Sequence, residues 1–199
     1  MGKKVLIATI FHSEPVLLSA MKFGPEKIIL LTSKDQTTEQ EKSIELIQES
    51  LGKVVDIKIS KIEVYDIVEV SKKVVEIIDS ENVDTEIYVN ITSGRKTQAI
   101  GLLFAAYARS NRIKKIAYLS EETKSIIYLP KLSFKLTDSQ KKILEEINKK
   151  NYSSTGELAN KIKLSTAMLY RAIDELKDMD FISTDDGIKL TDAGRIAQL

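Results

Sequence analysis

The sequence contains no cysteine and no tryptophan, and its 199 residues include a single histidine, His12. Without cysteine the chain cannot form a disulfide framework, a thiolate nucleophile or a cysteine zinc site. One histidine excludes every catalytic or metal-binding arrangement that needs two imidazoles. We therefore expect neither a metal ion nor a cofactor, and the lack of cysteine fits an intracellular protein.

Neither sign of charge predominates, because the chain has 30 lysines and arginines and 29 aspartates and glutamates, for a net charge of +1. Binding to nucleic acid or to a membrane would therefore depend on local patches. No segment reaches the roughly 18 apolar residues of a membrane span. The short apolar start, residues 4–10, lacks the small-residue cleavage site of a signal peptide. These absences predict a cytoplasmic protein.

Up to about residue 130, short runs rich in β-branched residues alternate with segments of helical periodicity, the pattern of a parallel sheet covered by helices. Ser13 and Asp66 are expected to cap two of the helices. The fold class predicted is α/β, with a Rossmann-like, mainly parallel six-stranded sheet, helices on both faces and a final hairpin. The expected strands are 4–10, 27–33, 54–60, 86–92, 115–119 and 125–129, and the expected helices are 14–23, 37–51, 66–81 and 96–110.

After residue 130 the pattern changes to helices followed by a hairpin. A helix capped at Thr137 or Asp138 precedes two helices joined by a three-residue turn, and Asp186-Gly187 suits the two-residue turn of a hairpin. This order is that of a winged helix-turn-helix. We therefore expect an α/β domain, a linker and a DNA-binding domain, at residues 1–130, 131–136 and 137–199.

The second of the two joined helices carries a buried stripe of Leu169, Ala172, Ile173 and Leu176. Its other face suits a DNA major groove, where Arg171 can read guanine and hydroxyl groups can contact phosphates. The residues expected at DNA are Lys161, Lys163, Ser165, Thr166, Met168, Tyr170 and Arg171.

A protein-docking module is the alternative for the same domain. From residue 131 onward the sequence has 12 basic and 11 acidic residues, so its charge does not favour DNA. The tip of the expected wing carries Asp185 and Asp186, where a wing that grips phosphate would prefer lysine or arginine.

Residues 89–101, VNITSGRKTQAIG, join the fourth expected strand to a helix. Anions bind readily at such an edge, because free backbone N–H groups and the helix dipole favour negative charge. The loop adds hydroxyl groups, a glycine and two cations: Thr92, Ser93, Thr97, Gly94, Arg95 and Lys96. The Walker pattern is absent, since Val89 stands where its first glycine would fall. A purely structural strand-to-helix turn is the alternative.

The loop after the first strand should emerge at the same edge of the sheet. Its residues Thr9, Phe11, His12, Ser13 and Glu14 would then meet the second loop. His12 is either a ligand contact, by stacking or hydrogen bonding, or an ordinary hydrogen-bonded histidine.

Three features together resemble a known family: T-x-x-x-x-E-x-x-L from Thr9, N-x-T-S-G-R-K from Asn90, and the winged helix. They are similar to those of the CRISPR-associated Rossmann-fold (CARF) regulators of archaea. The resemblance implies that residues 1–130 form a ligand-sensing and dimerisation domain. It also implies that the homodimer binds a cyclic oligoadenylate across its two-fold axis and controls CRISPR-Cas loci, with cyclic tetraadenylate favoured. Members often carry glycine where Phe11 stands, which leaves the ring size open. The implied ligand contacts are Thr9, Phe11, His12, Thr92, Ser93, Gly94, Arg95 and Lys96, and we add Ser13 and Thr97 beside them.

Three other functions compete with this interpretation. A ring nuclease would use the same pocket, with Lys96 or Arg95 stabilising charge and His12 as its base. A CRISPR ribonuclease needs an arginine and a histidine close together in one helix of the C-terminal domain, and His12 is too far away in sequence. A regulator of the same architecture could sense another phosphorylated metabolite.

Overall fold

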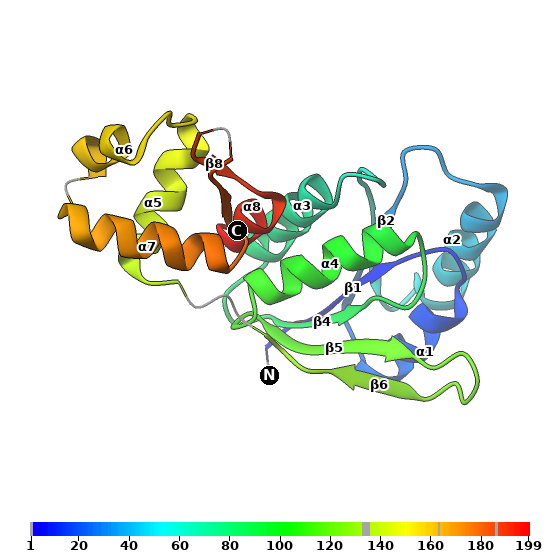
Figure 1. The fold of residues 1–199 in the computed structure, drawn as a ribbon. Coiled ribbons are helices and arrows are strands. Elements are labelled where there is room, and N and C mark those ends of the chain that lie inside the picture. Colours follow the sequence, from blue (N-terminus) through cyan, green and yellow to red (C-terminus); the bar gives the residue numbers. More distant parts are fainter. Residues whose placement is uncertain (1, 133–135, 163, 186) are drawn as a thin grey trace. The chain divides into compact units, whose positions relative to one another are not determined.

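The computed structural model describes residues 2–132, 136–162, 164–185 and 187–199. The chain forms two compact units, Met1–Ser133 and Phe134–Leu199, each with its own core (Figure 1). Residues 133–135 of the expected linker lie outside the described residues. Each unit is considered by itself below.

The N-terminal unit is a six-stranded sheet in the order β3-β2-β1-β4-β5-β6. Strands β1 to β5 are parallel, and β6 pairs antiparallel with β5 as the expected hairpin. The predicted fold class is confirmed. The strands are β1 (Lys4–Thr9), β2 (Lys27–Thr32), β3 (Asp56–Lys61), β4 (Glu86–Asn90), β5 (Ile113–Leu119) and β6 (Ile126–Leu129), and the helices are α1 (Glu14–Phe23), α2 (Thr38–Leu51), α3 (Ile67–Ser80) and α4 (Lys96–Ala108).

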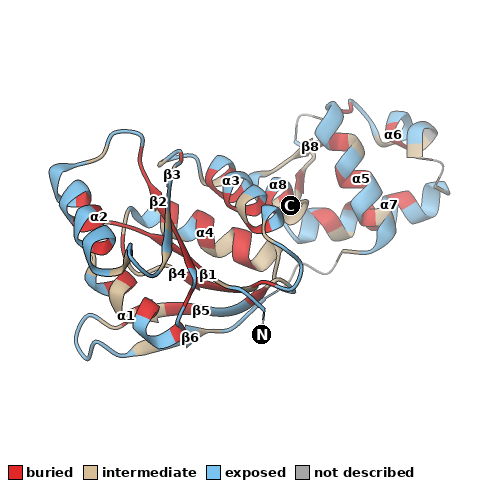
Figure 2. Cartoon of the chain, turned by 180° about the vertical axis from the view of Figure 1, so that it is seen from behind, coloured by how far each residue is buried: buried red, intermediate tan, exposed pale blue. Residues whose placement is uncertain are grey.

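Helices cover both faces of this sheet (Figure 1). Residues of α1 and α2 share one buried cluster with alternate residues of β1, β2 and β4. On the other face α3 packs closely on α4, because a Cβ at Gly101 would lie only 2.4 Å from Cγ1 of Val70. The central strands β1 and β2 are therefore buried almost throughout, whereas the edge strand β3 is mostly exposed (Figure 2). This difference follows from β3 having a neighbour on one side only.

The N-termini of the helices follow the sequence expectations in part. Asp66 caps α3, since its carboxylate accepts a hydrogen bond from the Glu69 N–H at 3.0 Å. The N-cap expected of the Ser13 hydroxyl is wrong: the residue already has helical dihedrals (φ −73°, ψ −33°) and its side chain makes no capping bond. A cap side chain needs an extended backbone to reach back to the first N–H groups.

The C-terminal unit is a winged helix-turn-helix, as expected. Its core joins the helices to the wing, and Gly187 has the positive φ (78°) that the hairpin turn requires. Asp186, the other expected turn residue, lies outside the described residues. The elements are α5 (Asp138–Lys149), α6 (Thr155–Ile162), α7 (Thr166–Asp178), β7 (Ile182–Ser183), β8 (Lys189–Leu190) and α8 (Asp192–Ala197).

One part of this core is not evident in the sequence. Tyr152 is 1% exposed, and its backbone exchanges two hydrogen bonds with Ile188 of the wing, at 3.3 and 2.7 Å. Its hydroxyl donates to Glu146 at 2.8 Å. Burial and that carboxylate raise the pKa of Tyr152 to about 12. The residue therefore ties the wing to α5.

Within the residues that the structure describes, no helix combines the length and the apolar character needed to cross a bilayer. In the same residues, no three histidine, aspartate or glutamate side chains gather as ligands for a metal ion.

Candidate ligand-binding site

The order of the strands marks one edge of the sheet as the place for a ligand. The chain passes from β1 to β2 on one side, whereas β4 lies against the other side of β1. The strand order therefore reverses between β1 and β4. In open α/β sheets, ligands bind at such a point, in the crevice between the two loops at the carboxyl ends of the strands. The loops after β1 and β4 are those that the sequence singles out.

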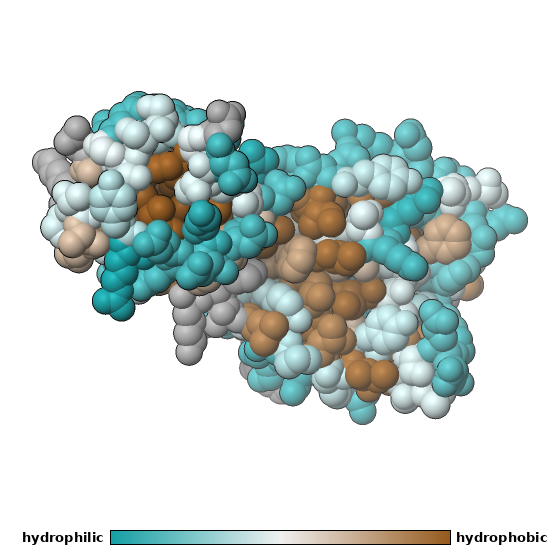
Figure 3. All heavy atoms as spheres, in the orientation of Figure 1, coloured by the Kyte–Doolittle hydropathy of each residue, from teal (hydrophilic) through white to brown (hydrophobic). Residues whose placement is uncertain are grey.

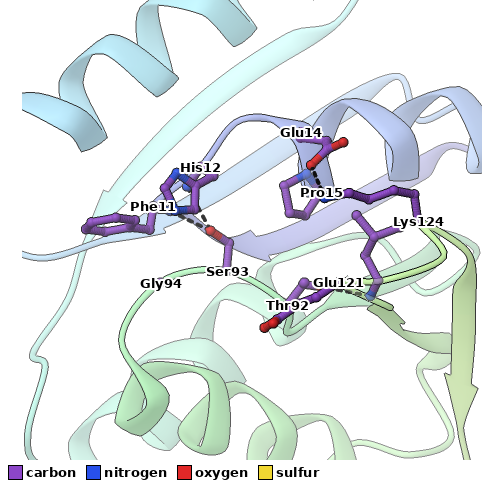
Figure 4. Close-up of a pocket in the computed structure, with 10 residues that line it drawn as sticks. Phe11, His12, Glu14, Pro15, Thr92, Ser93, Gly94, Glu121 and Lys124 are labelled. Atoms are coloured by element: carbon purple, nitrogen blue, oxygen red, sulfur yellow. Dashed lines mark hydrogen bonds and ion pairs between the residues drawn. The ribbon is translucent and has the colours of Figure 1, made fainter.

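The two loops are joined through Ser93 (Figure 4). Its hydroxyl oxygen accepts hydrogen bonds from the backbone N–H groups of Phe11 and His12, both at 2.9 Å. In return the hydroxyl of Thr9 donates to the Ser93 carbonyl. Thr9 is fully buried and Ser93 is 7% exposed. Both side chains hold the loops together, and their contact with a ligand stays a prediction.

Asn90, at the end of β4, holds the loop after β4 in place. Its buried amide donates to the hydroxyl of Ser19 at 2.6 Å, and its Oδ1 accepts from the Thr92 N–H at 2.8 Å. The Thr92 hydroxyl in turn accepts from the Leu119 N–H at 2.7 Å. Sequence reasoning gave Asn90 no role of its own, although a buried amide at the end of an apolar strand is a usable signal.

Gly94 allows the loops to approach each other. Its φ is 85°, and a Cβ there would lie 3.0 Å from Cβ of Thr9. Both the left-handed backbone and the narrow space favour glycine.

Between the loops and the β5–β6 turn lies a hollow of about 410 Å³. Its lining includes the charged side chains of Glu14, Glu121 and Lys124, and His12 lies beside them. Lys124 is a residue that sequence reasoning missed. The full lining is Phe11, His12, Glu14, Pro15, Thr92, Ser93, Gly94, Leu119, Glu121 and Lys124 (Figure 4).

The two cations of the SGRK segment do not line this hollow. Arg95 lines another hollow of about 280 Å³, shared with Lys34 and Tyr65. Lys96 is exposed at the start of α4 and, like Thr97, is among the lining residues of neither hollow. Ser13 is half-buried and lies outside both linings as well. The ligand contacts expected of these residues stay predictions.

His12 is exposed and lies edge-on to the Phe11 ring, with the centroids 4.7 Å apart. Its Nδ1 lies 3.3 Å from a carboxylate oxygen of Glu39. Of the three ring-nuclease candidates, His12 lines the first hollow, Arg95 lines the second, and Lys96 lines neither of these two.

In the C-terminal unit, the face of α7 opposite its core is open. Met168 and Tyr170 are 55% and 52% exposed, and Thr166 is also exposed. The Ser165 hydroxyl caps the helix by accepting from the Met168 N–H at 3.3 Å. The stripe predicted to be buried is buried: Leu169, Ala172, Ile173 and Leu176 are at most 6% exposed.

Arg171 is exposed and has a partner on its own helix. Its Nε donates to Glu175 at 3.0 Å, and the other carboxylate oxygen of Glu175 accepts from Gln140 of α5 at 2.9 Å. The Arg171 side chain is 84% exposed. Lys161 is exposed near the end of α6, and Lys163 lies outside the described residues.

The amino-acid sequence matches two family models. Residues 5–124 match the family described as "HFX_2341_N:-like, N-terminal". Residues 136–183 match the family described as "Winged helix-turn-helix DNA-binding". No curated protein sequence matches the chain.

Solved structures of larger proteins share the fold. Can2 from Sulfobacillus thermosulfidooxidans, in complex with cyclic tetra-adenylate, has a TM-score of 0.52 at 15% identity, over 98% of this chain and 63% of Can2. Enterococcus italicus Csm6, bound to cyclic hexa-2'-fluoro-hexa-dAMP, has a TM-score of 0.54 at 15% identity, over 89% and 55%. Protein VC1899 from Vibrio cholerae has a TM-score of 0.53 at 11% identity, over 98% and 64%. The chain thus spans less than two thirds of each, and similarity at this identity concerns the fold alone.

Proposed function

Since the chain belongs to the "HFX_2341_N:-like, N-terminal" family and ends in a winged helix, we propose that it is a ligand-responsive transcriptional regulator. The sensed ligand is a cyclic oligoadenylate, with cyclic tetraadenylate favoured, and the regulated genes are CRISPR-Cas loci. The resemblance to CARF winged-helix regulators, which the motifs carry, is confirmed for the fold. The ligand, the dimer and the regulated genes belong to the proposal.

One observation carries the proposal: the loops after β1 and β4 are hydrogen-bonded into a single polar edge through Ser93. This edge lies at the switch point of the sheet and beside the N-terminus of α4, where backbone N–H groups favour anions. Can2 and Csm6, whose structures hold cyclic oligonucleotides, share this fold, which supports a ligand of that class.

A homodimer is supported by the outer face of α4. Ile100 is 39% exposed, and Leu103, Phe104 and Tyr107 are partly exposed at helical spacing from it. Figure 3 shows apolar side chains gathered over α4 and the neighbouring β5–β6 strands. Ile127 of β6 is 50% exposed, and strand alternation places it on this face, since Ala117 and Tyr128 point to the α1 side. A second copy is the occupant that we propose for this apolar surface.

Lys96 connects the apolar face to the ligand edge. It lies one helical turn before Ile100, on the same stripe of α4. Pairing of two copies through α4 would bring the exposed ammonium groups of both Lys96 residues to the interface, beside the polar loops. A ring with approximate two-fold symmetry could then meet both protomers through the same residues.

DNA binding would follow from the two winged helices of such a dimer. Dimeric readers need half-sites about 34 Å apart, so a change in the angle between the two recognition helices changes DNA affinity. Arg171 and the exposed face of α7 supply the groove contacts in this proposal.

Calorimetry of the full chain with cyclic tetraadenylate, cyclic hexaadenylate and a cyclic dinucleotide tests the sensing role, with sedimentation in parallel. We expect a dimer that binds a cyclic oligoadenylate and shifts CRISPR promoter DNA in a ligand-dependent manner. Lys96→Ala should weaken ligand binding without lowering the melting temperature, whereas Lys73→Ala, at an exposed lysine of α3, should change neither. A monomer, or no heat with either oligoadenylate, contradicts the proposal. Linear products that vanish in Lys96→Ala would identify a ring nuclease instead.

A further inference from the structure

The hollow poses an electrostatic problem for an anionic ligand. Two carboxylates, Glu14 and Glu121, face it with a single ammonium group, that of Lys124. That ammonium is engaged, because Nζ of Lys124 lies 2.8 Å from Oε2 of Glu14. In this state the lining repels phosphate more than it attracts it.

The β5–β6 turn holds Lys124 in place. The Ser120 N–H donates to the Ser125 carbonyl at 2.9 Å, and the Lys124 N–H donates to the Ser120 carbonyl at 3.1 Å. Lys124 itself has a left-handed backbone (φ 52°), which is uncommon for a residue with a side chain. A turn bonded in this way presents the lysine to the hollow from a fixed backbone position (Figure 4).

The ion pair is inexpensive to open. The side chains of Lys124 and Glu14 are 51% and 53% exposed, and pairs so exposed add little stability. Glu14 also needs no cation, because it lies in the first turn of α1, where the helix dipole stabilises a carboxylate. Lys124 can therefore change partner without leaving an unfavourable charge behind.

We propose that Lys124 is a phosphate-binding residue of the ligand site and that Glu14 competes with the ligand for its ammonium group. In the free protein the pair fastens the β5–β6 turn to α1. In the complex, a phosphate of the ring takes the ammonium from Glu14, so that the turn is released from α1. The inference rests on the proposed function, and it adds a cation and a movable turn to that site.

Variants that remove one charge separate the role of Lys124 from that of Glu14. Binding is measured by calorimetry of the full chain, with cyclic tetraadenylate as the probe. Lys124→Gln should weaken binding about tenfold, as expected for the loss of one charge-assisted contact, whereas Lys124→Arg should retain it. Glu14→Gln should tighten binding two- to fivefold, on the order expected for an exposed pair. In a Lys124→Gln background, Glu14→Gln should have no such effect.

The Glu69–Lys72 pair of α3 is a matched control, with the same 2.8 Å separation and similar exposure. Neutralising either member should leave binding unchanged, and the melting temperature should show that every variant folds. If the wild type binds no oligoadenylate, the proposed function fails. If the wild type binds and Lys124→Gln binds equally well, only this inference is overturned. It is also overturned if Glu14→Gln tightens binding to the same extent without Lys124.

Discussion

Replacing Gly94 by alanine tests whether the two loops are held as tightly as the structure indicates. The backbone at Gly94 has φ of 85°, which costs a residue with a Cβ about 1–2 kcal/mol. The new Cβ would also lie 3.0 Å from Cβ of Thr9. Thr9 cannot move aside easily, because it is fully buried and its hydroxyl donates to Ser93. Crowding in such a place adds about 1 kcal/mol or more.

Gly24 provides the matched control. It also has a positive φ (59°), but nothing lies within 4 Å of a Cβ built there. Gly24→Ala should therefore lose only the backbone contribution, about 1 kcal/mol, and Gly94→Ala about 2–3 kcal/mol. For a unit of this size, 1 kcal/mol corresponds to a shift in melting temperature of about 4 °C.

Scanning calorimetry of the full chain measures both variants, using the transition of the N-terminal unit. We expect a fall of about 4 °C for Gly24→Ala and of about 10 °C for Gly94→Ala. Equal falls would show that Thr9 yields to the new methyl group, and the rigid junction of the loops would then be refuted.

Three further predictions concern other parts of the chain. Gln98 is fully buried, and among the described residues neither polar atom of its amide has a hydrogen-bond partner, so Gln98→Leu should raise the free energy of unfolding by about 1–2 kcal/mol in urea denaturation. The Lys149 ammonium and then the Tyr152 hydroxyl lower the pKa of Glu146 below 4.5. The ionised Glu146 carboxylate therefore stabilises the folded state above pH 4.5, and this contribution to stability is lost as the pH falls through the lowered pKa. The difference in melting temperature between wild type and Glu146→Gln should shrink accordingly in acid. Arg171→Ala should weaken DNA binding by roughly 1–3 kcal/mol and relax base preference; an unchanged gel shift would indicate that α7 docks on protein.

The periodicity of the sequence was sufficient to predict the elements, and a general rule about sheet edges predicted that the loops meet. Runs such as residues 27–33 are apolar on both faces, which only a covered strand tolerates. The strand order itself is set by packing between distant segments, and no local pattern encodes it. The burial of Tyr152 likewise depends on the wing, which lies more than 30 residues away in sequence.

The site was predictable in its loops but not in its charges. Arg95 adopts an extended backbone (φ −70°, ψ 138°) just before α4, and it lines a different hollow from its neighbours Ser93 and Gly94. Lys124 lies in SEETK, a sequence that resembles any solvated turn. Only the folded hairpin brings this lysine to the end of α1, 110 residues away in sequence from Glu14.

In the proposed function, the distribution of charge gives each protomer only part of an anion site. The hollow presents two carboxylates and one paired lysine. In the proposed function, backbone N–H groups at the N-terminus of α4 attract the phosphate. Lys96 is exposed one turn before an apolar surface that is itself suited to a second copy. If two copies pair through that surface, dimerisation buries it and also places both Lys96 side chains beside the loops. A phosphate then need only draw Lys124 from Glu14 to reverse the local balance of charge. Dimerisation and ligand binding are then coupled, because each supplies what the other lacks.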